Sequence, residues 1–288
     1  MFVKRLNSNF KLLDTPITHM GMYGNKVTEN SIGAITSSIS KGLPFEIDVV
    51  KAKDNIPVVC HNFSIYVGNK RFLIKDLTAS ELKEIKGIPT LEECILLNAG
   101  AVPMILDFKS VFPIYTKEYR NNIIKLLKNY NHEFAIQSFN PLFVRTIGRD
   151  LPNALKGQLI CRGKSLFEVF NLKNRESVAN LYEVLSSFIC LVSDSDYIGL
   201  EIQRCKVWNN QLEQFLFGAS DEIQNIFLEL TSVVTKKPII GWTLKSLSEL
   251  NISPFVFTNY IFDPDNPDNY DLFADKISNR NILCSTKG

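Results

Sequence analysis

The sequence lacks the features that mark membrane, secreted and nucleic-acid-binding proteins. Its longest uncharged apolar run lies near residues 184–192 and is too short to span a bilayer. Lys and Arg total 32 against 30 Asp and Glu, with no block of like charge, so charge gives no reason to expect a nucleic-acid or membrane partner. The opening residues, MFVKRLNSNFKLLD, have no continuous apolar core and do not predict a secretion signal.

Cysteine and glycine motifs are also missing. The six cysteines are scattered, with neither a CxxC pair nor the spacing of a zinc site. Such cysteines are typical of buried thiols in a reducing compartment, and we expect a cytoplasmic protein. The chain has no GxGxxG and no GxxxxGKS motif, which a doubly wound, nucleotide-binding sheet would place after its first strand.

What the chain does contain is an alternation of short apolar runs with helical patterns. We predict eight strands: a first one ending at His19, then residues 43–50, 102–109, 134–139, 155–161, 196–202, 238–244 and 254–258. Helices are expected between them, including residues 166–187 and a long helical stretch, 208–234, broken at Gly218. Eight β/α units in 288 residues favour a single-domain (β/α)₈ TIM barrel over residues 1–288, and an open doubly wound sheet is the alternative.

Helix starts are marked by capping residues. Thr28 or Asn30 is expected to cap the first long helix, and Asp76 or Thr78 to start the next. Thr90, with a glutamate three residues later, predicts a capping box.

The second predicted strand carries two acids in an apolar run. Glu46 and Asp48 are two residues apart, so their side chains share one face of the strand. A second apolar run ends at His61, and a two-residue turn at Asp54-Asn55 would make a β-hairpin over the barrel mouth with Asp48 opposite His61. The alternative is a surface hairpin with ordinary exposed charges. Carboxylates in an apolar strand are costly unless they are paired or bind metal, which favours a functional site.

Other polar residues follow neighbouring strands at the end where barrel active sites lie. They are His19 after strand one and Asp107 and Lys109 at the end of strand three. Three carboxylates suit Mg²⁺ or Ca²⁺, and two histidines suit proton transfer. Lys109 suits a phosphate oxygen, so the set indicates attack at phosphorus, with a local Asp107–Lys109 ion pair as the alternative for those two residues. His132, in a helix–strand connection, is expected to be a surface residue.

An ordered set of short motifs resembles the glycerophosphodiester phosphodiesterase family, whose members fold as TIM barrels. The similarity covers most of the chain and is strongest from His19 to Lys109. The matching segments are His19-Met20-Gly21, Thr28-Glu29-Asn30-Ser31, Glu46-Ile47-Asp48, Val58-Val59-Cys60-His61-Asn62, Asp107-Phe108-Lys109, Gln137-Ser138-Phe139 and Trp242-Thr243.

The resemblance implies a role for each residue of the set. A divalent cation, Mg²⁺ or Ca²⁺ with Mn²⁺ as a further candidate, would be held by Glu46, Asp48 and Asp107. His19 and His61 would form the acid–base pair, and Lys109 would contact phosphate. Trp242 would line the glycerol side, although barrel packing is an equally good explanation for a tryptophan there. A substrate hydroxyl would attack phosphorus, and water would then open the resulting cyclic phosphate.

Four positions depart from the family pattern. Met20 occupies a substrate-binding position where the family has a phosphate-binding arginine, and methionine offers no bidentate donor. Asp107 is shorter than the usual glutamate, and Asn62 and Asn259 replace aspartates. Because the metal and proton-transfer groups persist while a phosphate contact is lost, we expect an active phosphodiesterase with altered substrate preference.

The leading hypothesis is therefore metal-dependent hydrolysis of a phosphodiester of glycerol or a related polyol, as in lipid and glycerol metabolism. Candidate substrates include glycerol-phosphate-containing glycans and nucleotide diesters, and no nucleic-acid partner is expected. One alternative is a lyase-like relative that stops at the cyclic phosphate. Another is a non-catalytic barrel that binds phosphodiesters.

Overall fold

The structure is a computed structural model of the chain. It describes residues 10–24, 26–109, 116–161, 194–202, 237–251, 257–263 and 267–285. The predicted helices at 166–187 and 208–234 lie outside the described residues. The extension of a single domain over all of residues 1–288 stays a prediction.

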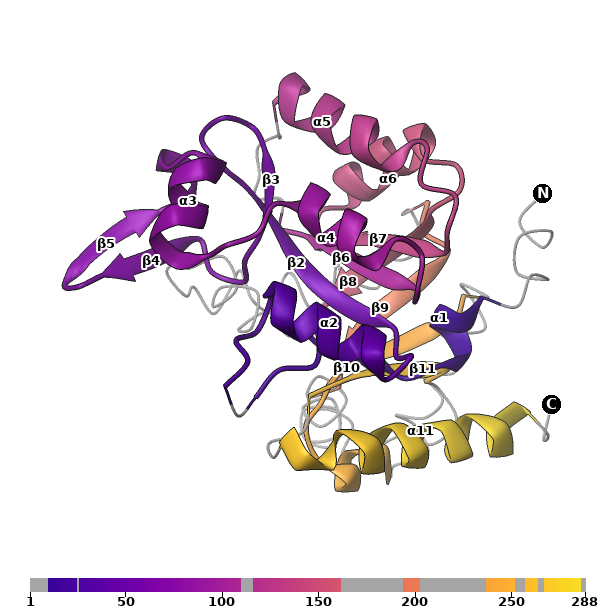
Figure 1. Cartoon of the computed structure of the whole chain (residues 1–288). Helices are drawn as coiled ribbons and strands as arrows, with labels where there is room; N and C mark the ends of the chain where they lie inside the picture. The colour runs from indigo at the N-terminus through magenta and orange to yellow at the C-terminus, as the bar shows by residue number, and fades with distance from the viewer. Residues whose placement is uncertain are drawn as a thin grey trace, which may run out of the picture.

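Eight parallel strands close into a barrel (Figure 1). They are β1 (Ile17–Thr18), β2 (Phe45–Lys51), β6 (Met104–Phe108), β7 (Phe134–Ser138), β8 (Leu155–Ile160), β9 (Tyr197–Glu201), β10 (Ile239–Leu244) and β11 (Asn259–Phe262). The short strand β1 pairs with β2 on one side and with β11 on the other, which closes the ring. The predicted (β/α)₈ barrel is confirmed.

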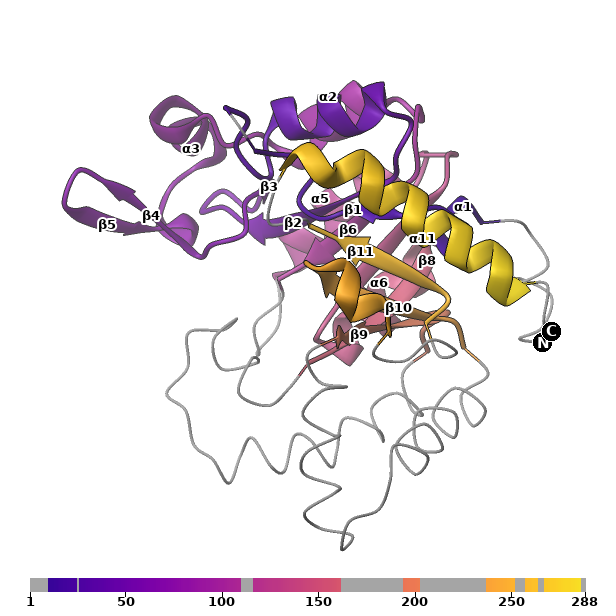
Figure 2. The same cartoon turned by 90° about the horizontal axis from the view of Figure 1, so that it is seen from below.

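Helices lie outside the strands (Figure 1). The α-helices are α1 (Lys11–Asp14), α2 (Ile32–Ser40), α3 (Ala79–Lys86), α4 (Leu91–Asn98), α5 (Lys117–Leu127), α6 (Pro141–Asp150) and α11 (Tyr270–Ser285). Short 3₁₀ helices cover η2 (Ile74–Asp76), η3 (Leu247–Asn251) and η4 (Pro267–Asn269). Helix α11 packs on β11 (Figure 2). The centroid of the Phe262 ring lies 5.6 Å from that of Tyr270 and 6.0 Å from that of Phe273. In the part of the chain that the structure describes, no helix is both long and apolar enough to cross a membrane.

Alternation along the strands separates two apolar regions. Ile105, Ala135, Leu155 and Ile240 belong to one buried cluster in the barrel interior. Their strand neighbours, such as Leu106 and Ile136, belong to the cluster under the helices. Because the interior is filled by apolar side chains at the level of Ile105, the next inward position, two residues further along β6, is left for a polar group.

Two of the three helix-cap predictions are confirmed. The Thr78 and Thr90 hydroxyls each accept the backbone N–H three residues on, in capping boxes. Helix α2 is capped by Ser31 instead of Thr28 or Asn30. The reason is that Thr28 offers its carbonyl to the Ser31 hydroxyl, while the Asn30 side chain bonds Asp48.

The hairpin after β2 is present, but its predicted register is wrong by one residue. Strand β3 (Pro57–Val59) runs antiparallel to β2 with Val49 opposite Val59, so Asp48 faces Cys60 and not His61. The turn is longer than two residues because Ala52 bonds Ile56 across it and Asn55 takes a left-handed φ of 61°. A second hairpin, β4 (Ser64–Val67) with β5 (Lys70–Leu73), was not predicted and projects away from the barrel (Figures 1 and 2).

Of the predicted last strand, residues 254–258, residues 254–256 lie outside the described residues, and Phe257 and Thr258 come before the observed strand β11. Strand β11 begins at Asn259, which pairs with Ile240 on β10, and its ladder to β1 begins where Ile261 lies beside Ile17. Phe257 comes before the strand, where it contacts Tyr260 with ring centroids 5.3 Å apart. The apolar run thus continues past Thr258, and pairing with β10 and β1 places the strand at Asn259–Phe262.

Asn259 stabilises the end of the barrel opposite the site described below. Its buried Nδ2 donates to the Leu12 carbonyl at 2.9 Å and to the Thr15 carbonyl at 2.6 Å, tying α1 to the start of β11. This explains why an asparagine, which can donate, suits a position where an aspartate was expected.

We expect Asn259→Ala to lower the free energy of unfolding by about 2–3 kcal/mol, because two carbonyls lose their donor in a buried place. Urea unfolding would measure it, with the exposed Asn121→Ala on α5 as a near-neutral control. An Asn259→Ala protein as stable as the parent would show that these bonds contribute nothing.

Candidate functional site

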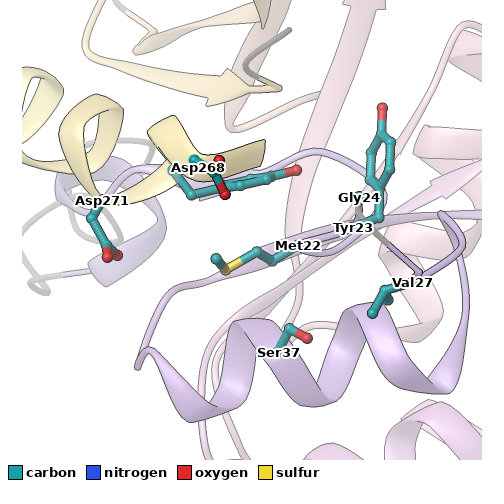
Figure 3. A pocket seen from close by; sticks show the side chains of 8 residues that line it. Met22, Tyr23, Gly24, Val27, Ser37, Asp268 and Asp271 are labelled. Carbon is teal, nitrogen blue, oxygen red and sulfur yellow. The ribbon is translucent and has the colours of Figure 1, made fainter. Parts of the chain in front are cut away.

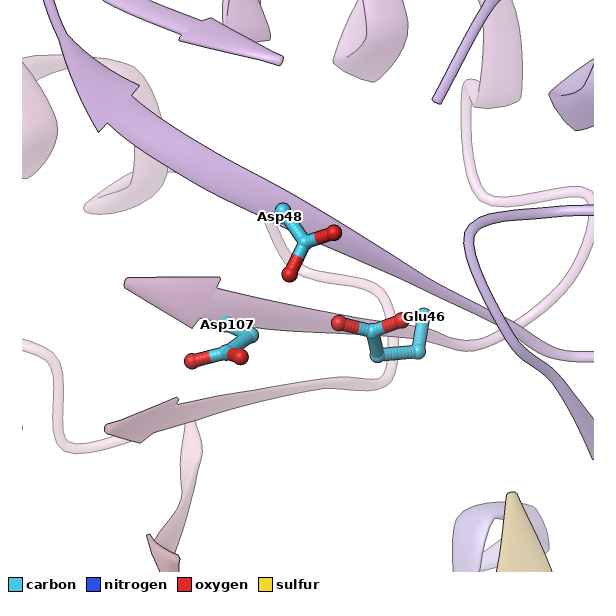
Figure 4. Close-up of side chains that lie close together, drawn as sticks. All are labelled: Glu46, Asp48 and Asp107. Atoms are coloured by element: carbon cyan, nitrogen blue, oxygen red, sulfur yellow. The ribbon is translucent and has the colours of Figure 1, made fainter. Parts of the chain in front are cut away.

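Three buried carboxylates converge inside the barrel. Glu46 and Asp48 lie on the inward face of β2. Asp107 lies on the neighbouring strand β6, in register with Asp48 (Figure 4). One oxygen from each lies within 4.8 Å of the others, and the residues are 2%, 1% and 5% exposed. The strand alternation that predicted a shared face therefore brings all three acids together.

Lys109 lies among these acids. Its Nζ is 2.8 Å from Asp48 Oδ1 and 3.0 Å from Asp107 Oδ2. Oδ1 of Asp107 is buried and has no hydrogen-bond partner among the described residues. An all-oxygen donor set with one unused buried carboxylate oxygen fits a hard divalent cation, and these acids could bind a metal.

A side chain and a backbone N–H of the β1–α2 loop hold two of the carboxylates in place. The Asn30 side chain donates to Asp48 Oδ2 at 2.8 Å and accepts the Asp48 N–H at 2.9 Å. The Met20 N–H donates to Glu46 Oε2 at 3.1 Å. The Met20 side chain itself is buried, and its φ of 54° is left-handed. Asn30 was missed as a site residue because its place before a helix favoured a capping role.

The charges of the cluster separate the pKa values of its members. Burial, with Asp48 beside it, raises the pKa of Glu46 to about 8. Burial opposes ionisation of Asp48 as well, but the Lys109 ammonium outweighs it and lowers the pKa of Asp48 to about 2. Burial raises the pKa of Asp107. In the protein without metal, Glu46 and Asp107 therefore hold a proton more readily than Asp48 does.

Two predicted histidines lie near the acids. His19 directly follows β1, and its backbone N–H bonds the Phe262 carbonyl at 3.0 Å. Burial opposes protonation of His19, but Asp263, Glu46 and Asp48 together raise its pKa. His61 is half-buried, and its charge acts on Asp48 and Asp107, although less than burial and Lys109 do. His132 is exposed, as expected.

Trp242 lies on β10 across the barrel from the acids. Its ring meets Phe139 edge-on, with centroids 5.8 Å apart, and it packs against the interior apolar cluster. Its indole Nε1 is buried and has no hydrogen-bond partner in the part of the chain that the structure describes. The residue therefore packs the barrel and also keeps an unused donor.

Asp263 and Tyr23 were not predicted. The Tyr23 hydroxyl donates to Asp263 Oδ2 at 2.6 Å, and His19 Nδ1 lies 3.5 Å from the same oxygen. The signal for Asp263 was an acid directly after an apolar run, as at Asp107, but the predicted last strand ended before it.

A separate hollow of about 370 Å³ lies beside Tyr23, between α2 and the start of α11 (Figure 3). Met22, Ser37 and Asp271 line it. Asp271 already pairs with Lys41 at 2.7 Å. The Tyr23 hydroxyl points away from Ser37 and Asp271.

We expect the metal-free protein to lose stability as the pH rises from 4.5 to 8, in part through Glu46. Over this range the unfolded chain ionises Glu46 while the folded chain keeps it protonated, so folding becomes less favourable. Relative to wild type, Glu46→Gln should remove about 1–3 kcal/mol of that decline.

Chelator-treated protein unfolded in urea at several pH values measures this difference. The exposed Glu84→Gln on α3 serves as the control and should decline as wild type does. An equal decline in Glu46→Gln and wild type would contradict the raised pKa.

Solved structures share this fold. One is a glycerophosphodiester phosphodiesterase from Thermotoga maritima, 19% identical, with a TM-score of 0.61 over 91% of this chain and 97% of that one. Another is an Oleispira antarctica phosphodiesterase in complex with the product sn-glycerol-3-phosphate, 17% identical, with a TM-score of 0.63 over 94% and 98%. A third, a glycerophosphodiester phosphodiesterase from Parabacteroides distasonis, is 18% identical, with a TM-score of 0.59 over 91% and 96%.

At these identities the structures support the barrel and say nothing by themselves about chemistry. Among curated proteins the sequence finds no match. A family model does match, over residues 19–197, a range that begins at His19 and includes all three buried acids. The chain therefore belongs to the glycerophosphoryl diester phosphodiesterase family, whose members are phosphoric diester hydrolases.

Proposed function

We propose that the protein hydrolyses a phosphodiester of glycerol or a related polyol with the help of a divalent cation. The observation that carries the proposal is the group of three buried carboxylates around the Lys109 ammonium. A barrel built only for stability would not gain by burying three acids with one lysine, because each buried charge has a desolvation cost. A site that handles a charged phosphate has a use for them.

Glu46, Asp48 and Asp107 would hold the cation, with Mg²⁺, Ca²⁺ or Mn²⁺ as candidates. When bound, the cation supplies positive charge that neutralises the phosphate oxygens during attack. Lys109 would then be released from part of its pairing with the acids and contact phosphate as a point charge.

His19 and His61 would transfer the protons. One imidazole takes the proton of a substrate hydroxyl as its oxygen bonds to phosphorus, and the other protonates the alcohol oxygen as its bond to phosphorus breaks. A cyclic phosphate and a free alcohol result. Water then adds to phosphorus, a ring P–O bond breaks, and the two histidines exchange roles.

The substrate side differs from the family pattern at Met20. Its side chain is buried and cannot replace a guanidinium, so the phosphate depends more on Lys109 and the cation. Trp242 would line the glycerol side with its unused Nε1 donor. The sn-glycerol-3-phosphate in the Oleispira antarctica relative supports a glycerol phosphate product, with glycerol-phosphate glycans and nucleotide diesters as further substrates to test.

The location in the cell stays a prediction. Among the described residues, Cys60 and Cys94 are free thiols, which suits the reducing cytoplasm that we expected.

The three histidines provide a matched test. We expect His19→Ala and His61→Ala each to lower kcat by about 10²–10⁴-fold, because a proton-transfer group is lost. The exposed His132→Ala should match wild type. Purified protein would be assayed with each cation against a panel of glycerol, glycan and nucleotide diesters.

Phosphorus NMR of the product separates the alternatives. A monoester supports hydrolysis, whereas a cyclic phosphate that accumulates would indicate a lyase. If the protein bound diesters but turned none of them over with any of the cations tested, it would be a binding protein, and the proposal would be contradicted.

A further inference from the structure

His19 has a carboxylate neighbour outside the acid cluster. Asp263 Oδ2 lies 3.5 Å from His19 Nδ1, and both side chains are largely buried, with 14% and 19% exposure. Catalytic contacts are often longer in a free enzyme than in its complex with substrate, and 3.5 Å falls in that range.

The barrel closure brings these two residues together. Thr18 on β1 is in register with Phe262 on β11, and the His19 N–H bonds the Phe262 carbonyl. His19 and Asp263 are the next residues on each strand. Their adjacency is therefore fixed by a backbone ladder and not by flexible side chains.

Tyr23 holds the carboxylate from the other side. Its hydroxyl donates to the same Oδ2 at 2.6 Å, a short distance typical of a bond to an ionised acceptor. Burial opposes ionisation of Asp263, but His19 beside it and the hydrogen bond from Tyr23 outweigh it and lower its pKa. The group that faces Nδ1 is thus an ionised carboxylate whose Oδ2 already accepts the Tyr23 hydroxyl.

We propose that Asp263 is a positioning residue for His19 and that Tyr23 holds Asp263 in place. The carboxylate accepts the Nδ1–H of His19, which leaves the Nε2 on the far side of the ring to exchange a proton with substrate. It also stabilises the imidazolium whenever His19 carries the proton. The part of this inference that concerns proton exchange with substrate rests on the proposed function. The part that concerns which ring nitrogen of His19 carries the proton does not.

A purely structural role makes a different prediction. If Asp263 only ties the β11 end to the Tyr23 loop, its loss lowers stability and leaves the ring state of His19 and kcat unchanged. Asp263→Asn keeps the shape and removes the charge, and Tyr23→Phe removes only the hydroxyl.

Kinetics form the first arm of the test. We expect Asp263→Asn to lower kcat by about 10–100-fold with KM within about threefold, and Tyr23→Phe to lower kcat by about 3–10-fold. The double variant should be about as slow as Asp263→Asn, because both act through one carboxylate. Asp271→Asn, an exposed acid paired with Lys41, is the control and should match wild type.

Nitrogen NMR of ¹⁵N-histidine-labelled protein forms the second arm and needs no turnover. The chain has three histidines, so three imidazoles are seen, and His19→Gln assigns one of them. In neutral His19 we expect the proton on Nδ1, with a shift toward the Nε2–H form in Asp263→Asn.

Unchanged His19 nitrogen shifts in Asp263→Asn would overturn the inference, even if the protein turned over no diester. If Asp263→Asn does not fold, Tyr23→Phe decides: unchanged kcat and unchanged His19 shifts would overturn the inference. If wild type turned over no diester but its His19 carried the proton on Nδ1, and that proton moved in Asp263→Asn, the result would contradict the proposed function alone.

Discussion

The Lys109 ammonium lies between two of three carboxylates that the barrel has removed from water. Its contacts to Asp48 and Asp107, at 2.8 and 3.0 Å, offset part of the repulsion among the acids. Burial, with Asp48 beside it, raises the pKa of Glu46 to about 8 when no cation is present. Buried pairs of this kind contribute little net stability, since desolvation cancels much of the attraction. Their role in the proposed function is to hold charged groups in place before binding, so that a divalent cation and a phosphate would meet opposite charges already in position.

The barrel makes this arrangement possible because inward-facing side chains on the same strand are apolar at one level and polar at the next. Apolar residues such as Ile105 and Ala135 fill the interior at one level, and Asp107 and Gln137 occupy the next inward positions on the same strands. The buried Tyr197 hydroxyl donates to Gln137 at 2.9 Å, so polar groups at this level bond one another. The same ladder that closes the ring places His19 beside Asp263.

Much of this could be read from the sequence, because it follows from strand periodicity. The spacing of Glu46 and Asp48 fixes their shared face, and parallel strands with a common end bring Asp107 to them. The hairpin register could not be read in the same way, because the conformation of Asn55 and the length of the turn decide it and several turns suit an Asp-Asn pair. The bounds of the last strand could not be read because apolar residues continue past Thr258, and pairing with β10 and β1 sets the observed strand at Asn259–Phe262. Asn30, Tyr23 and Asp263 were missed because their roles lie in contacts between distant segments, which leave no periodic pattern.

Divalent-cation binding is the most direct measure of the three-carboxylate centre. Titration of the protein with Mn²⁺, followed by the loss of the free-ion signal in electron paramagnetic resonance, counts the sites and gives their Kd without any substrate. A single saturable site per chain is expected, weakened by at least about tenfold in Asp107→Asn because a charged oxygen ligand is lost. No saturable binding by the wild-type chain, or an equal Kd in Asp107→Asn, would contradict the assignment of these acids as metal ligands.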